Sequence, residues 1–525
     1  MQCKGAVTGT YQMNLQRKLY QIIISRLDGG RICDQAYQEA ILTLIRKGIG
    51  GFIIFGGNRD DVTPFINKLQ SMAEIPLFIA SDIERGVGQQ VEGYTDFPCQ
   101  MAVSAAIRRG NTEDLTILGD IIRTIAIEAI DAGINMPLIP VLDVNNNPDN
   151  PIICTRAFSD NPEDVSFFGL EYIRELERLN LISCAKHFPG HGDTSIDSHI
   201  SLPQIAKSYD ELVNSDIRPF KEAVRTGVSS IMIGHLLIPA IDDSVPASLS
   251  KRVITDVLRK GLGFNGLVMT DALNMSAISA FDNVAARCID AGADIILHPP
   301  DADSTVRELA NAVETKLISE EAIDTAVDRI IKAKSRLSQI KKIDVDYGKN
   351  NSLSKLVREM SITVVKEKSG ILPVTDDSNI HVVIAGEERL CEHSLWMARF
   401  EKISMLTKGD ENVLVGWAPP TNKLGEGGQC PPYTIVAIFS EVAAWRGRSG
   451  IYNQEVEKIN KLIRNSRSSI VISFGSPYIL RYFKDADVLI AAYEANKQAQ
   501  EAVIKCLCGE IGFRGRLPVS LFAEV

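Results

Sequence analysis

The sequence predicts an α/β protein of two domains, and three observations support this. Eight short apolar runs, each followed by a helix-like pattern, fill about the first 340 residues. A polar stretch without periodicity follows them, and five further apolar runs alternate with helical stretches in the remainder. The chain has 525 residues, which is enough for two or three domains of roughly 100–200 residues each.

The first eight runs are continuously apolar, as expected of strands buried on both faces of a parallel sheet. Helix signals separate them; the helix expected after Ser319, for example, has that residue at its N-cap and acidic residues in its first turn. Eight βα units predict a (β/α)8 barrel of the TIM type over residues 1–340. The predicted strands lie at residues 21–27, 50–56, 76–82, 134–144, 181–187, 229–235, 266–272 and 293–299.

Residues 341–355 are polar and unpatterned, so they are predicted to be the linker. Residues 356–525 then predict a doubly wound α/β domain. This part has no Walker A pattern and no GxGxxG after a strand, and we interpret GEGGQC at 425–430 as a mobile loop rather than a phosphate cradle. Its β-type runs lie at 381–387, 412–418, 434–440, 469–475 and 487–494.

Composition excludes several classes of function. The net charge of -10, without a Lys/Arg run, argues against a nucleic-acid groove. No stretch reaches the roughly 18 apolar residues of a membrane span, and the N-terminus shows no apolar signal-peptide core. Ten dispersed cysteines look like small buried hydrophobes. We therefore expect a cytoplasmic protein that binds no nucleic acid and has no membrane span.

Polar residues follow nearly all of the predicted barrel strands. Catalytic groups of such barrels lie at the carboxyl ends of the strands, although any one polar residue there can instead cap the next helix. The convergence on one rim favours an active site. The residues concerned are Asp82, Asp143, Lys186, His187, His235, Asp271 and His298, with Arg156 in the long loop after the fourth strand.

Asp271 suggests nucleophilic chemistry, and a separate pair, Asp197 and His199, suggests acid/base chemistry. Asp271 is either a carboxylate nucleophile, able to form a glycosyl ester, or the N-cap of the next helix. Asp197 and His199 are two residues apart, so the carboxylate can orient an imidazole that protonates a leaving oxygen and later deprotonates water. Spacing alone leaves open that this is a surface loop with an incidental histidine.

A metal site is a minor alternative. His187 and His191 are four residues apart, but Pro189 and Gly190 lie between them, and proline breaks the helix on which such a pair would bind a metal. We therefore expect no metal or cofactor and interpret Lys186 and His187 as donors to sugar hydroxyls.

Two motifs resemble glycoside hydrolase family 3, in its β-N-acetylglucosaminidase branch. They are KHFPGHGDTSIDSH at 186–199 and GLVMTDALNM at 266–275. The resemblance covers about the first 340 residues. The ending AAYEANKQAQEAVIKCLCGEIGFRGRLPVSLF at 491–522 also resembles the α/β sandwich domain of longer members.

The resemblance implies a role for each matching residue. Asp271 matches the nucleophile, His199 the acid/base and Asp197 its carboxylate partner. The positions that match contacts to the terminal sugar are Asp82, Arg156, Lys186 and His187. The sequence departs from the family after Asp82, where it reads IERGVGQQ and places Gln90 at a common arginine position, which puts that sugar contact in doubt.

The resemblance implies a retaining exo-β-N-acetylglucosaminidase acting on small carbohydrates, with peptidoglycan turnover fragments as the expected substrate. The alternatives are a phosphorylase, because a neutral imidazole repels phosphate less than a carboxylate does, and a β-glucosidase using a second-domain glutamate such as Glu441. A zinc amidohydrolase and a non-catalytic sugar-binding protein complete the alternatives.

Overall fold

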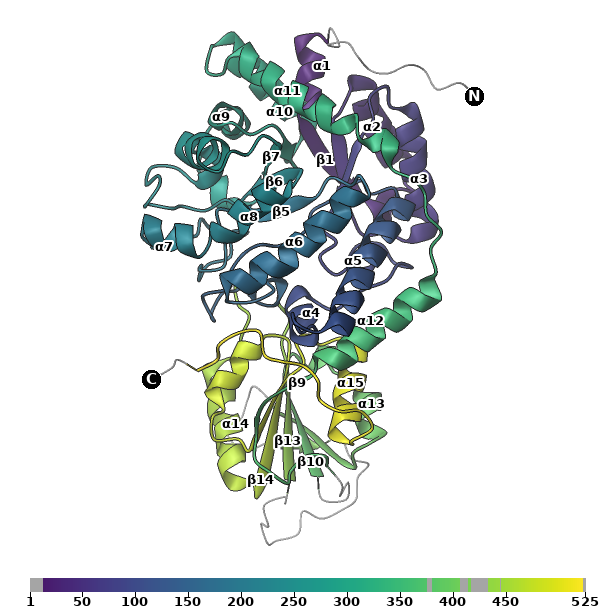
Figure 1. Cartoon of the computed structure of the whole chain (residues 1–525), viewed down its shortest axis with the longest axis vertical. Coiled ribbons are helices and arrows are strands. Elements are labelled where there is room, and N and C mark those ends of the chain that lie inside the picture. Colours follow the sequence, from purple (N-terminus) through teal and green to yellow (C-terminus); the bar gives the residue numbers. More distant parts are fainter. Residues whose placement is uncertain (1–12, 375–379, 407–413, 417–432, 444, 523–525) are drawn as a thin grey trace.

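The computed structural model describes residues 13–374, 380–406, 414–416, 433–443 and 445–522. Two α/β units follow each other along the long axis of the molecule (Figure 1). The N-terminal unit is the predicted barrel and the C-terminal unit is a sheet covered by helices on both faces, so the predicted fold class is confirmed.

The barrel has eight short parallel strands. Hydrogen bonding orders them β4-β3-β2-β1-β8 and β5-β6-β7, and the parallel bridges Val141 to Lys186 and Met269 to Ile295 join the two sets. Every predicted barrel strand overlaps an observed one. The strands are β1 (Ile23–Asp28), β2 (Gly51–Phe55), β3 (Phe78–Ser81), β4 (Met136–Pro137), β5 (Cys184–Phe188), β6 (Ser230–Ile233), β7 (Leu267–Thr270) and β8 (Ile296–Leu297).

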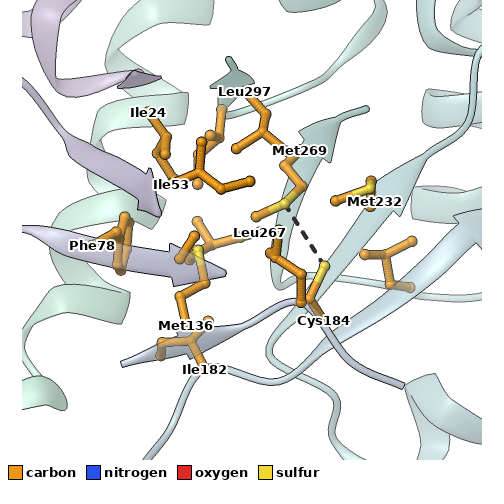
Figure 2. Close-up of a cluster of buried hydrophobic side chains, with 14 of the residues drawn as sticks. Ile24, Ile53, Phe78, Met136, Ile182, Cys184, Met232, Leu267, Met269 and Leu297 are labelled. Carbon is orange, nitrogen blue, oxygen red and sulfur yellow. Dashed lines mark hydrogen bonds between the residues drawn. The ribbon is translucent and has the colours of Figure 1, made fainter. Parts of the chain in front are cut away.

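Apolar side chains from all around the barrel meet in its interior (Figure 2). Cys184 and Met269 approach within 3.7 Å through their sulfur atoms, and both are fully buried. This packing fills the barrel interior, so functional side chains can gather only at the ends of the strands. The labelled side chains of this cluster are Ile24, Ile53, Phe78, Met136, Ile182, Cys184, Met232, Leu267, Met269 and Leu297.

Helices surround the barrel, and several of them begin directly after a polar N-cap residue. Ser319 accepts the Ala322 N–H at the start of α11 (Glu320–Lys334), as predicted. A π-helical segment spans Arg252–Gly261. The other helices are α1 (Leu15–Gln21), α2 (Gln35–Lys47), α3 (Arg59–Met72), α4 (Gln100–Ala106), α5 (Thr112–Ala132), α6 (Pro162–Arg178), α7 (Tyr209–Asn214), α8 (Arg218–Thr226), α9 (Val284–Ala291) and α10 (Ala302–Glu314).

A helix connects the two units. α12 (Tyr347–Ser361) begins inside the range predicted as a linker and contacts α4 of the barrel and α15 of the second unit. Polar contacts fix it: Asn350 donates to Glu128 at 2.7 Å, and Arg358 donates to Asp96 and Glu494. Because polar side chains make these buried contacts, the segment lacks the apolar periodicity that predicts a helix.

The second unit contains one sheet in the order β12-β11-β10-β13-β14-β15-β9. The two edge strands are antiparallel to their neighbours: β12 pairs with β11, and β9 pairs with β15. The five strands between them are parallel. The sequence predicted neither β9 nor β11, and residues 425–430 lie outside the described residues. The strands are β9 (Thr363–Glu367), β10 (Ile380–Gly386), β11 (Lys402–Leu406), β12 (Leu414–Gly416), β13 (Tyr433–Phe439), β14 (Ser468–Phe474) and β15 (Val488–Ala491).

Helices cover both faces of this sheet. α13 (His393–Met397) and α15 (Lys497–Leu507) pack on one face through residues such as Trp396 and Val503. α14 (Asn453–Asn465) packs on the other face, together with side chains of barrel helix α4. The second core is thus continuous with the barrel at α4. Within the described residues, no helix is long and apolar enough to cross a bilayer.

Candidate active site

A cavity of about 800 Å³ lies at the carboxyl ends of the barrel strands, where the second domain meets the barrel. All parallel strands end on this side, so loops after β3, β4, β5 and β7 converge here. From the second domain, Ser440–Ala443, Trp445 and Glu494 line the cavity. The predicted residues that line it are Asp82, Gln90, Arg156, His187, His199, Asp271 and His298.

Lys186 does not itself line the cavity, but it lies in a charge cluster with three residues that do, Asp82, Glu84 and Arg156. Its ammonium group contacts Asp82 Oδ1 at 2.6 Å and Glu84 Oε1 at 2.8 Å. Arg156 binds both oxygens of Glu84, at 2.7 and 2.9 Å. Burial acts to raise the pKa of Glu84, but Arg156 and Lys186 hold it well below its ordinary range. A preorganised set of charged donors and acceptors of this kind suits the hydroxyl groups of a sugar.

Asp143 organises the stretch that follows β5. Its Oδ2 contacts His187 Nδ1 at 2.7 Å, and its Oδ1 accepts the backbone N–H groups of His187 and His191. His187 therefore presents its other ring nitrogen toward the cavity. His191 has both ring nitrogens engaged, with Thr194 Oγ1 and Ser198 Oγ, each at 2.9 Å. Burial lowers the pKa of His191 to about 4, so this ring is neutral near pH 7.

The loop of residues 189–199, here called the DSH loop, packs closely on the barrel. A Cβ atom at Gly192 would lie 1.8 Å from the Val144 carbonyl oxygen, so only glycine fits there. Asp197 and Ser198 are buried, which excludes an exposed loop with an incidental histidine. The loop instead presents His199 to the cavity.

Asp271 follows β7 and carries the least engaged carboxylate of the cavity. In the described part of the chain its hydrogen bond is to the Ala272 N–H, from Oδ1 at 2.7 Å. No α-helix follows at once, so the N-cap alternative is wrong. Burial acts to raise its pKa, but His187, His235 and His199 together bring it below the ordinary value of 3.8. Asp271 is therefore an ionised carboxylate with one oxygen available for attack.

The Asp197 and His199 side chains form a pair. Asp197 Oδ1 lies 2.9 Å from His199 Nδ1, which leaves Nε2 as the imidazole nitrogen available to a ligand. Burial acts to raise the pKa of Asp197, but hydrogen bonds from His199 and Trp445 lower it by more. A carboxylate that stays ionised beside an imidazole stabilises the imidazolium formed during proton transfer.

The remaining predicted rim residues have other roles. His235 is buried and lies behind Asp271, with Nε2 3.2 Å from the Ala272 carbonyl oxygen. His298 packs against Phe55, and burial lowers its pKa to about 4. Glu441 lines the cavity but is paired with Arg389 and Arg446. In the described ranges, no group of three His, Cys, Asp or Glu side chains has an arrangement suited to a metal ion.

Sequence reasoning missed two important residues of the site, Glu84 and Trp445. Glu84 stands in the IERG stretch, where the sequence departs from the family, and its two cationic partners come from other parts of the barrel. Trp445 comes from the second domain and contacts the DSH loop across 248 positions of sequence. No local pattern predicts contacts of that range.

Comparisons with known proteins show the family to which the chain belongs. Residues 14–333 match the family described as Glycosyl hydrolase family 3 N terminal domain. The chain is 29% identical to Beta-hexosaminidase A of Pseudoalteromonas piscicida, over 91% of this chain and 90% of that protein. It is 26% identical to Beta-N-acetylglucosaminidase/beta-glucosidase of Cellulomonas fimi, over 90% of this chain and 89% of that protein.

A solved structure extends the likeness to both domains. A glycoside hydrolase family 3 β-N-acetylglucosaminidase from Paenibacillus sp. str. FPU-7 superposes with a TM-score of 0.80 at 27% identity. The match covers 98% of this chain and 100% of that one. With the family match over more than half of its length, the chain belongs to glycosyl hydrolase family 3 and is a glycoside hydrolase.

Proposed function

We propose that this enzyme is a retaining exo-β-N-acetylglucosaminidase. The observation that carries the proposal is that His199, held by the buried Asp197, lines the same cavity as the ionised Asp271 carboxylate. A nucleophilic carboxylate and a separate proton donor are the two groups that a retaining glycosidase needs. The names of the relatives from Pseudoalteromonas piscicida and Cellulomonas fimi support the choice of N-acetylhexosaminides.

The reaction proceeds in two steps. Asp271 attacks the anomeric carbon of the terminal sugar while His199 protonates the departing oxygen, giving a covalent glycosyl ester. His199 then removes a proton from water, which attacks the same carbon and releases the sugar with its original configuration. Asp197 keeps the imidazole oriented in both steps.

The sugar-binding end of the cavity supplies the affinity in this proposal. Asp82, Lys186 and Arg156 offer charged groups to the sugar hydroxyls, with His187 and Gln90 beside them. Glu441 is less suited to be the acid of a β-glucosidase, because two arginines already bind its carboxylate.

We further propose that GlcNAc–anhydromuramyl peptides are a substrate. This part rests on resemblance to the family branch alone. Incubation with purified muropeptides, followed by mass spectrometry, should show loss of one GlcNAc unit. An unchanged muropeptide would contradict this substrate but not the proposed N-acetylglucosaminidase activity.

The first experiment compares aryl β-N-acetylglucosaminide with aryl β-glucoside, each with and without millimolar phosphate. Faster turnover of the acetamido sugar, unaffected by phosphate, is the expected result. Stimulation by phosphate, with sugar 1-phosphate as product, would make the enzyme a phosphorylase. Preference for the glucoside would contradict the proposed specificity, and no turnover of either sugar would contradict the proposed activity.

A further inference from the structure

The DSH loop belongs to the barrel, but the second domain contacts both members of the acid/base pair. Asp197 Oδ1 accepts the His199 backbone N–H at 2.9 Å and lies 2.9 Å from His199 Nδ1. Asp197 Oδ2 accepts the backbone N–H of Trp445, at 2.8 Å. The Trp445 indole also meets the His199 ring, with centroids 4.9 Å apart and planes at 62°.

These contacts determine how the imidazole is oriented. The terminal torsion of an aspartate side chain has a broad energy minimum, so a carboxylate held through one oxygen can rotate. The Trp445 N–H on the second oxygen fixes the carboxylate plane and therefore the direction of the bond to His199 Nδ1. The indole limits tilting of the ring, so Nε2 keeps one direction into the cavity.

The backbone of Trp445 has an unusual conformation. Its φ angle is +71°, in the left-handed region that bulky residues rarely adopt. Such strained residues persist where the surrounding contacts hold them, and they cluster at functional sites. Here the conformation accompanies both contacts, the N–H to Asp197 and the ring to His199.

A second anchor lies four residues further on. Ser449 Oγ donates to the Asn150 carbonyl oxygen at 2.8 Å. Asn150 Nδ2 in turn donates to the His191 carbonyl oxygen at 2.9 Å and to Thr194 Oγ1 at 3.3 Å. Residues 445–449, here called the clamp segment, therefore reach the DSH loop directly at its end and through Asn150 near its start.

We propose that the clamp segment is a positioning element for the acid/base pair, with Trp445 as its main positioning residue. The proposal rests on the proposed function and gives the second domain a part in proton transfer. Trp445 touches no reacting atom in this scheme; it acts through Asp197 and His199. Substitution of Trp445 should therefore weaken acid catalysis in the same way as a partial loss of His199 function.

The test is a series of aryl β-N-acetylglucosaminides whose phenol leaving groups differ in pKa. Protonation by the acid matters little for a dinitrophenolate and greatly for an alkylphenol, so kcat/KM against leaving-group pKa measures acid catalysis. The variants are Trp445→Ala, Trp445→Gly, Trp445→Phe and Ser449→Ala, with His199→Ala as the reference for loss of the acid.

We expect Trp445→Ala to lose about 10- to 100-fold in kcat/KM with the poorest leaving groups and less than about 3-fold with the dinitrophenolate. Trp445→Gly should lose less than Trp445→Ala, because glycine keeps a positive φ without strain and so retains the N–H bond to Asp197. Trp445→Phe should retain most activity because it preserves an aromatic ring. Ser449→Ala should show a smaller loss of the same kind.

Met397→Ala is the matched control. Met397 is a half-exposed side chain of α13, outside the clamp segment and the cavity lining, and its loss should leave the dependence of kcat/KM on leaving-group pKa unchanged. Thermal unfolding midpoints show which variants fold; if Trp445→Ala does not, the Gly and Phe variants still decide the question.

If Trp445→Ala lost kcat/KM equally across the leaving-group series, or lost none, the proposal would be overturned. A larger loss of kcat/KM in Trp445→Gly than in Trp445→Ala would also overturn it. A wild-type enzyme inactive on every member of the series would instead contradict the proposed function. The two failures are therefore distinguishable.

Discussion

Glu84 shows how one carboxylate shapes the end of the cavity that we propose binds the sugar. It is buried between Arg156 and Lys186, and its pKa is held low because both cations favour the ionised form over the cost of burial. Asp82, on the other side of Lys186, and Arg156 are the parts of this cluster that remain partly exposed. The cluster is therefore a rigid unit that offers one accessible carboxylate to a ligand.

Glu84→Gln should destabilise the protein strongly, because it leaves the buried Lys186 and the part-buried Arg156 with one anion fewer. We expect the free energy of unfolding in urea to fall by about 3–5 kcal/mol, and KM to rise. Glu163→Gln is the control: Glu163 pairs with Arg218 at the surface, and its loss should change stability by less than about 1 kcal/mol. Equal effects of the two substitutions would contradict the assigned role of Glu84.

Asp271→Asn tests the nucleophile. Asparagine keeps an oxygen for the Ala272 N–H but does not form the ester, so kcat should fall about 10⁴-fold while the unfolding midpoint hardly moves. Intact-mass measurement with a slow fluorosugar substrate should show a covalent adduct on wild type and none on the variant. Turnover close to wild type would disprove the assignment.

At the scale of elements, the DSH loop depends on a neutral His191. Its pKa is about 4 in the folded protein against 6.5 for an ordinary histidine, so the unfolded chain binds more protons between these values. Stability should therefore fall as the pH drops from 6.5 to 4, by about 3 kcal/mol in total from this residue.

The measurement is the free energy of unfolding of wild type and His191→Gln at pH 7 and pH 4. The variant should be less stable at pH 7, where it loses the bonds to Thr194 and Ser198. The gap between the two proteins should narrow toward pH 4. A gap that stays constant with pH would show that His191 is not buried in its neutral form.

The sequence predicted elements well where burial is apolar and local. All eight barrel strands and α11 follow from their apolar patterns. β9 (Thr363–Glu367) is an edge strand with an exposed end, and α12 is held by the polar side chains Asn350 and Arg358, so neither carries such a pattern. The position of Asp271 at the cavity followed from its place after a strand, and that of His199 from the family resemblance. The contacts of Glu84 and Trp445 depend on distant loops.

At the scale of the whole molecule, Lys334 is a buried ionisable side chain that does not line the cavity. Its ammonium group donates to Gln21 Oε1 at 2.9 Å and to the Gly50 carbonyl oxygen at 2.8 Å, at the amino ends of β1 and β2. Burial lowers its pKa from 10.5 to about 7. Above pH 7 the unfolded chain therefore binds more protons at this residue than the folded one.

Stability should accordingly rise between pH 7 and pH 10, by about 1 kcal/mol for each pH unit from this residue. Lys334→Met removes the titrating group, so the difference in unfolding free energy between wild type and variant should change with this slope. Lys332→Met, on an exposed part of the same helix, is the control and should leave the slope intact. Parallel curves for wild type and Lys334→Met would contradict the lowered pKa.

The junction built around Arg358 has a consequence for how the enzyme fails. This α12 side chain binds Asp96 of the barrel and Glu494 of the second domain, and Glu494 also accepts the Cys99 N–H of the barrel. The two domains, which both line the cavity, are thus held together by buried polar contacts. Because one arginine joins both domains in this way, heat should unfold the barrel and the second domain together, in a single transition.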